Sequence, residues 1–147
     1  MEPRTDPVRE RIERAAEGLV YSSETDRPFE FRRFPAVAIP VTRLSATELA
    51  SLAGARGGDV EEITLDELLA RHIERVDALD VESRRLVPRY EALRDAIRES
   101  LADVRVVRHG RVEVRCFVLG NDRDTGEIAG VETVAVERSR PSGGFTT

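Results

Sequence analysis

Apolar residues recur at helical spacing in the second half of the chain. Five of them, each three or four positions from the next, are Leu86, Tyr90, Leu93, Ile97 and Leu101. This spacing places all five on one face and predicts a long amphipathic helix, with Asp80 as the candidate N-cap. Pro88 interrupts the pattern, so we expect either a late helix start or a kink there.

Three shorter helices carry start signals. Asp6 followed by Pro7 is typical of an N-cap and a first helical residue, and apolar positions recur after it. The stretches 45–48 (SATE) and 64–67 (TLDE) match the capping box, in which Ser or Thr and a Glu three positions later bond each other's backbone. Each box therefore predicts a helix that begins at its second residue.

The last third of the chain alternates apolar and polar positions, as strands do. One such run contains Val112, Val114, Cys116 and Val118. Residues 104–107 and 128–136 predict a strand on either side, with a turn at His109–Gly110 and a hairpin loop at 120–127. Gly130 predicts a bulge in the last strand. Consecutive strands joined by short turns pair antiparallel.

Two more strands are expected earlier, at residues 28–34 (PFEFRRF) and 60–64. Helices must then cover the apolar faces of the sheet, which gives a layered α+β fold. We expect one domain over residues 1–138, followed by a flexible tail at 139–147.

The net charge and the single cysteine restrict the binding partners and the cellular compartment that we expect. The net charge is −5, from 28 acidic and 23 basic residues, whereas non-specific nucleic-acid binding needs a basic surface. We therefore expect no direct contact with nucleic acid, while a basic protein surface would be a suitable partner. Cys116 alone cannot form an intrachain disulfide. No apolar run has the length of a signal peptide or a membrane span, so we expect a cytoplasmic protein.

The residues that usually carry catalysis are sparse. His72 and His109 lack acidic or cysteine partners at ligand spacing, so we expect surface or turn roles for both. Cys116 lies on an apolar strand face and is expected to be a buried, inert thiol. The stretch 121–127 (NDRDTGE) resembles a calcium loop but lacks the downstream Glu. The sequence predicts a protein that is not an enzyme and has no cofactor of its own.

Two groups of acidic residues stand out. Glu24 and Asp26 lie in the polar stretch SSETDRPFEF, which is either a chain-reversing turn or a binding loop held by the sheet. Asp77, Asp80 and Glu82 precede the long helix, where they either complement its dipole or form part of an acidic contact surface.

The stretch AAEGLVYSSETDRPFEFRRF resembles the start of the nuclease A inhibitor family. The positions that match the family are Ser23, Glu24, Pro28, Phe29 and Glu30. The resemblance continues through ITLDELLARH, RYEALRDAIRESL and VEVRCFVLG to GEIAGVETVAVE, and it covers roughly residues 12–137. It implies a three-layer α/β/α sandwich with a mainly antiparallel sheet, of the kind seen in pathogenesis-related-1 proteins.

The resemblance also implies a function. A bacterial inhibitor of this kind forms a heterodimer with a sugar-non-specific DNA/RNA nuclease and plugs its active site. The implied contacts are Ser23, Glu24, Asp26, Asp77 and Thr147, the last through its hydroxyl on the nuclease Mg²⁺. This chain departs from the family in running past Arg138 to Thr147. Alternatives are an interaction scaffold of the same fold, or a small ligand-binding domain or enzyme.

Overall fold

The computed structural model describes residues 6–35, 37–73 and 81–137. Its centre is a five-stranded sheet with the strand order β3-β7-β6-β5-β4, and every neighbouring pair is antiparallel. The strands are β3 (Glu30–Phe34), β4 (Val60–Ile63), β5 (Leu101–His109), β6 (Glu113–Asp122) and β7 (Ile128–Val136). The predicted α+β class with a mainly antiparallel sheet is confirmed.

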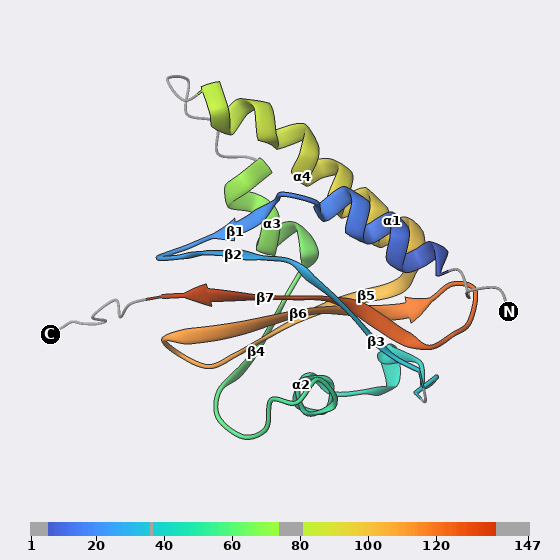
Figure 1. Ribbon diagram of the computed structural model, residues 1–147. Helices are drawn as coiled ribbons and strands as arrows, with labels where there is room; N and C mark the ends of the chain where they lie inside the picture. Colours follow the sequence, from blue (N-terminus) through green and yellow to red (C-terminus); the bar gives the residue numbers. More distant parts are fainter. Residues whose placement is uncertain (1–5, 36, 74–80, 138–147) are drawn as a thin grey trace, which may run out of the picture.

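Helices cover both faces of this sheet (Figure 1). On one face lie α1 (Pro7–Ala16), α3 (Leu65–Ile73) and α4 (Val81–Ser100). On the other face lie the short helix α2 (Ala46–Leu52) and the 3₁₀ turn η1 (Val41–Arg43). None of the helices in the described residues is long and apolar enough to cross a lipid bilayer.

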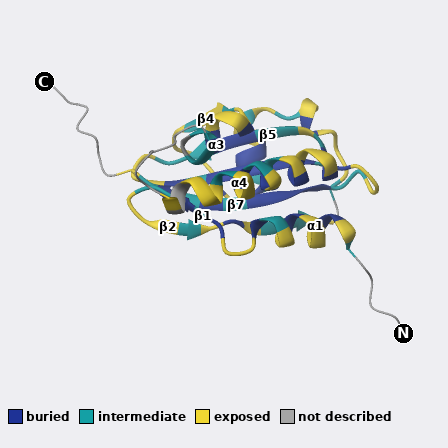
Figure 2. Cartoon of the chain, turned by 90° about the horizontal axis from the view of Figure 1, so that it is seen from above, coloured by how far each residue is buried: buried dark blue, intermediate teal, exposed yellow. Residues whose placement is uncertain are grey.

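The alternation of β6 supplies both halves of the core. Cys116 and Val118 point to the side of α1, α3 and α4, whereas Phe117 and Leu119 point to the side of α2. All four side chains are buried, which confirms the expected burial of Cys116. Figure 2 shows β7 buried beneath the helices, while the outer side of α1 is exposed. A strand buried on both faces reads as a near-continuous apolar run.

The predicted helix starts are present. The carboxylate of Asp6 accepts a hydrogen bond from the N–H of Arg9 at 3.1 Å, and Pro7 is the first residue of α1. Both capping boxes, at residues 45–48 and 64–67, make their reciprocal bonds at 2.7–3.0 Å. These signals are local, so the surrounding fold did not have to be known to read them.

The expected late start of the long helix at Pro88 is wrong. The helix α4 begins at Val81 and passes through Pro88. Pro88 cannot donate to the carbonyl of Arg84, but both side chains are exposed, so the unpaired carbonyl lies on the solvent side. The expected N-cap, Asp80, lies outside the described residues.

Gly130 is not a bulge, because its pairing with both neighbouring strands is regular. A Cβ at this position would overlap the carbonyl oxygen of Val118, so glycine permits a close approach of two backbones. The irregularity of the sheet lies instead between Ala102 and Arg105, where Asp103 has a positive φ of 55°.

The strand expected at 28–34 is present as β3, over residues 30–34, and joins the main sheet beside β7. Its expected first residue, Pro28, belongs instead to β2 (Asp26–Pro28), which pairs with a strand that the sequence pattern did not indicate, β1 (Val20–Ser22). The polar stretch after α1 is therefore a β-hairpin whose turn consists of residues 23–25.

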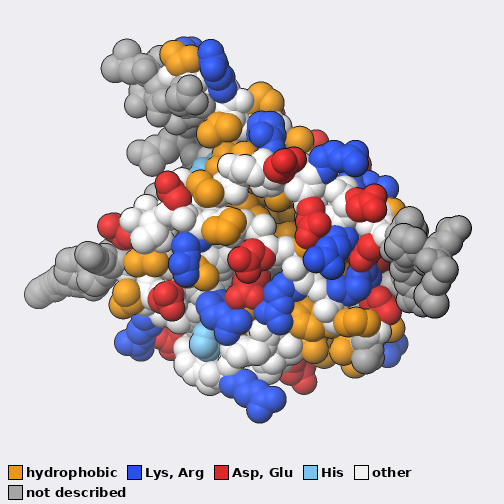
Figure 3. Space-filling view, in the orientation of Figure 1, with side chains coloured by type: hydrophobic (Ala, Val, Ile, Leu, Met, Phe, Trp, Pro, Cys, Tyr) orange, Lys and Arg blue, Asp and Glu red, His pale blue; other side chains and the backbone are white. Residues whose placement is uncertain are grey.

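Ion pairs tie the elements together at the surface. Arg33 on β3 binds the carboxylates of Asp6, Asp122 and Glu127 at 2.7–3.0 Å, which joins the start of α1 to the β6–β7 loop. That loop is a hairpin loop, as expected. Figure 3 shows acidic and basic side chains lying beside one another over this view of the molecule.

Candidate functional site

The tip of the β1–β2 hairpin presents the acidic residues that the sequence singled out. Glu24 lies in the middle of the turn, and Asp26 is the first residue of β2, opposite Ser22. Glu24 and Asp26 are both exposed. In Figure 1 the hairpin lies at the end of the molecule where β7 stops and α4 begins. The stretch reverses the chain as a hairpin turn and is also tied to the main sheet, while its role in binding stays a prediction.

The end of β7 holds this tip from one side. The N–H of Glu24 donates to the carbonyl oxygen of Val136 at 3.1 Å. The hydroxyl of Ser23 accepts from the N–H of Val136 at 2.9 Å and donates to the carbonyl of Thr25 at 3.1 Å. Further along β7, the hydroxyl of Thr133 donates to the carbonyl of Arg27 at 3.3 Å. The backbone of Glu24 is thereby fixed while its side chain faces solvent.

Aromatic residues hold the hairpin from the other side. Tyr21 and Phe29 are buried and meet edge to face, with ring centroids 6.3 Å apart. Tyr21 also packs on the ring of His72 in α3, which stacks on Tyr90 in α4 at a centroid distance of 4.3 Å. The hydroxyl of Tyr90 donates to the carbonyl of Val20 at 2.5 Å. The first strand of the hairpin is thus joined to two helices.

The two acidic side chains of the tip have no ion-pair partner among the described residues, as is also true of other exposed acids such as Glu10 and Glu99. Elsewhere, acids such as Glu62 are engaged, and the hydrogen bond from Arg105 holds the pKa of Glu62 below its ordinary value. Within residues 6–35, 37–73 and 81–137, no hydrogen bond or ion pair occupies the carboxylate of Glu24 or Asp26. The hairpin therefore offers carboxylates that remain available to a partner.

The charge of Asp26 also acts on the hydroxyl of Tyr90. Burial raises the pKa of the Tyr90 hydroxyl, and the charge of Asp26 raises it further, against the lowering effects of the Val20 bond and of Arg89. Tyr90 therefore remains a neutral hydrogen-bond donor at physiological pH, which is the state that its bond to Val20 requires.

The structure brings together three of the five predicted contact residues. Ser23, Glu24 and Asp26 lie on one hairpin, and the hydroxyl of Ser23 is engaged within it. Asp77 and Thr147 lie outside the described residues, so their roles stay predictions.

Sequence reasoning missed the support of the hairpin. His72, expected to have a surface or turn role, is half-buried in the aromatic cluster, and His109 bonds the carbonyl of Gly57. The signal for His72 was present: it follows Leu65, Leu68 and Leu69 at positions seven, four and three, on the buried face of α3. A histidine at such a position is a candidate core residue.

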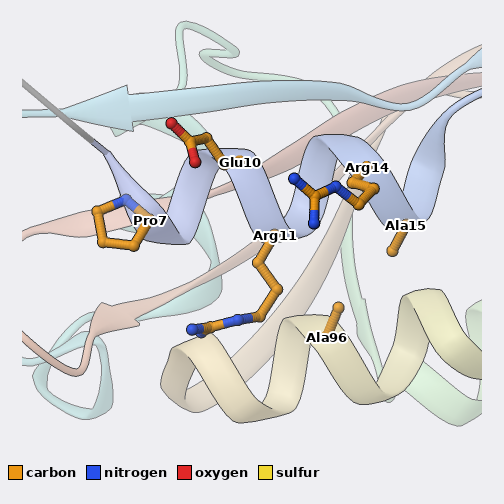
Figure 4. Close-up of a pocket in the computed structure, with 6 residues that line it drawn as sticks. All are labelled: Pro7, Glu10, Arg11, Arg14, Ala15 and Ala96. Atoms are coloured by element: carbon orange, nitrogen blue, oxygen red, sulfur yellow. The ribbon is translucent and has the colours of Figure 1, made fainter.

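The described residues show little that resembles a catalytic site. A groove of about 380 Å³ runs between α1 and α4 and is lined by Pro7, Glu10, Arg11, Arg14, Ala15 and Ala96. Figure 4 shows Arg11 reaching from α1 toward α4, where it donates to the hydroxyl of Ser100 at 2.9 Å. Neither histidine lines this groove. Over the described ranges, no group of three or more His, Cys, Asp or Glu residues could hold a metal ion.

Comparison with known proteins identifies a family whose model matches this chain. The family model described as nuclease A inhibitor-like protein matches residues 6–138. No curated protein matches the chain. The matched range contains the hairpin and all of the elements described above.

Proposed function

This chain belongs to the nuclease A inhibitor-like family, and we propose that it binds a sugar-non-specific DNA/RNA endonuclease and blocks its active site. The observation that carries this proposal is the exposed carboxylate of Glu24 on a hairpin held from two sides. Ser23 and Asp26 flank it on the same hairpin.

The chemistry of a nuclease site suits such a group. That site is built to attract phosphates, so a fixed carboxylate can take the place of a nucleic-acid phosphate. A loop that is already ordered loses little conformational freedom when it binds. Encounter with a basic active-site surface is further favoured by the net charge of −5.

Two further contacts belong to the proposal. Asp77 adds a second acidic contact ahead of α4, and the hydroxyl of Thr147 reaches the Mg²⁺ of the nuclease. Mg²⁺ prefers oxygen ligands, so a hydroxyl from the inhibitor fits its coordination chemistry. We also propose that the fold belongs with the three-layer sandwiches of the pathogenesis-related-1 type, in keeping with the helices on both faces of the sheet.

The direct test is inhibition of a nuclease of this class, preferably one from the same cell. The purified protein is titrated into a DNA-degradation assay, and complex formation is followed separately by calorimetry. Inhibition with one-to-one binding supports the proposal. Binding without inhibition would favour an interaction scaffold, and no binding at micromolar concentration would end the inhibitor proposal.

A further inference from the structure

The β1–β2 hairpin is too short to keep its shape alone. Each of its strands has three residues, and even longer isolated hairpins are marginally stable in water. The position of Glu24 therefore depends on what the hairpin packs against. The end of β7 holds the side of β2 and the turn, and the stacked pair of His72 and Tyr90 holds the side of β1.

The stacked pair contacts both ends of β1. Tyr90 donates its hydroxyl to the carbonyl of Val20, the first residue of the strand, at 2.5 Å. The N–H of Ser22, the last residue, donates to Nε2 of His72 at 3.4 Å. The ring of Tyr21, between them, packs edge-on against His72 at 5.4 Å. Every residue of β1 is thus in contact with one ring or the other.

We infer that His72 and Tyr90 are positioning residues of the nuclease-binding hairpin. The inference rests on the proposed function, because it assigns these two residues a role in binding. They act through the backbone of β1, which sets the direction in which the turn presents Glu24. A binding loop that is fixed in advance gains affinity by avoiding the loss of freedom on binding.

The two rings act on β1 in different ways. Nε2 of His72 accepts the hydrogen bond from the N–H of Ser22, and its ring packs against Tyr21, whereas the hydroxyl of Tyr90 donates to the carbonyl of Val20. Loss of either hydrogen bond should therefore loosen one end of β1.

The test compares substitutions that separate stacking from hydrogen bonding. His72→Phe keeps a flat ring and removes the acceptor, whereas His72→Gln keeps an acceptor and removes the ring. Tyr90→Phe removes only the hydroxyl. The matched control is His109→Gln, at the other histidine, whose ring bonds Gly57 rather than the hairpin. Thermal unfolding of each variant shows that the domain remains folded.

Two measurements are made on each protein at one pH. The first is the amide exchange protection of Ser22 and Glu24 in the free protein, by NMR. The second is the inhibition constant against the nuclease. His72→Phe and Tyr90→Phe should lower the protection and weaken inhibition roughly threefold to tenfold, the effect of one net hydrogen bond. His72→Gln, which keeps an acceptor, should lose less than His72→Phe.

Unchanged protection at Ser22 and Glu24 in both His72→Phe and Tyr90→Phe would overturn the inference. So would lost protection with unchanged inhibition, or a loss of inhibition in His72→Gln as large as that in His72→Phe. If the unmodified chain inhibits no nuclease, the proposed function fails instead. The exchange data would then still decide whether the two rings hold the hairpin.

Discussion

The N–H of Val136 donates a hydrogen bond of 2.9 Å to the hydroxyl of Ser23, across 113 positions of the chain. Ser23 directly precedes Glu24, whose own N–H returns to the carbonyl of Val136. These two bonds place the hairpin tip against the end of the last strand. The acidic turn is therefore part of the tertiary structure.

Removing the hydroxyl of Ser23 should loosen the tip of the β1–β2 hairpin. Ser23→Ala leaves the N–H of Val136 without its partner, and we expect a loss of roughly 1 kcal/mol in the free energy of unfolding. Urea unfolding measures this loss. Ser23→Thr keeps a hydroxyl and should lose less. Equal losses in the two variants would show that the hydroxyl is not what holds the tip.

The carboxylate of Glu24 should matter for binding and hardly at all for folding. Glu24→Gln keeps the size of the side chain and removes the charge, so the nuclease complex should weaken by about 2 kcal/mol if Glu24 is a hot spot. Calorimetry gives the affinity, and thermal unfolding should change little because the side chain is exposed. Glu99→Gln, at an exposed position near the end of α4, is the matched control. An unaltered affinity in Glu24→Gln would remove this residue from the interface.

Acid should destabilise the domain through Asp122. Burial acts to raise the pKa of this carboxyl, but the N–H groups of Asp124 and Thr125 and the guanidinium of Arg33 outweigh it and hold the pKa below the ordinary value of 3.8. A lowered pKa means that the folded state favours the charged form. The resulting stability is complete well above pH 4 and is lost as the pH falls through the lowered pKa.

The variant Asp122→Asn isolates this contribution. It should be less stable than the unmodified chain at pH 7, by roughly 1–3 kcal/mol, because Arg33 loses a buried charged partner. Denaturant unfolding from pH 7 to pH 2 should show a shallower decline for the variant. Parallel curves for the two proteins would assign the acid sensitivity to other carboxyls.

Glycine should be required at position 130. In Gly130→Ala the added Cβ would overlap the carbonyl of Val118 on the neighbouring strand, and a backbone atom cannot move aside as a side chain can. Overpacking of this kind typically lowers stability by about 1–3 kcal/mol. Denaturant unfolding checks the value. Val134→Ala, at a half-buried position of the same strand, should lose less, and a harmless Gly130→Ala would contradict the close approach.

The elements that sequence reasoning predicted well are those with local signals. Both capping boxes and the Asp6–Pro7 start depend on residues within four positions, and the strand β6 was indicated by the apolar residues at every second position from Val114 to Val118. The strand β1 has three residues and no pattern of its own. It forms because Tyr90, His72 and Val136, all distant in sequence, meet its backbone and the turn after it.

The same distinction explains the errors. Pro88 predicted either a later helix start or a kink because its local effect is unfavourable, and the later start is wrong since an exposed position allows water to satisfy the freed carbonyl. Gly130 was expected to be a bulge, but glycine is needed there because the carbonyl of Val118 on the neighbouring strand leaves no room for a Cβ. The contact role of Glu24 was inferred from its polar stretch and its family match, and the bonds that fix its backbone could not be read from them.

The strand β7 lies between β3 and β6 along its first residues and meets the hairpin at its far end. A pull on the tip is therefore transmitted along this strand into the middle of the sheet. There the ladders on both sides oppose sliding together, in shear, instead of opening one bond at a time. A partner seated on the tip can be pulled away under tension while the anchor beneath it stays folded.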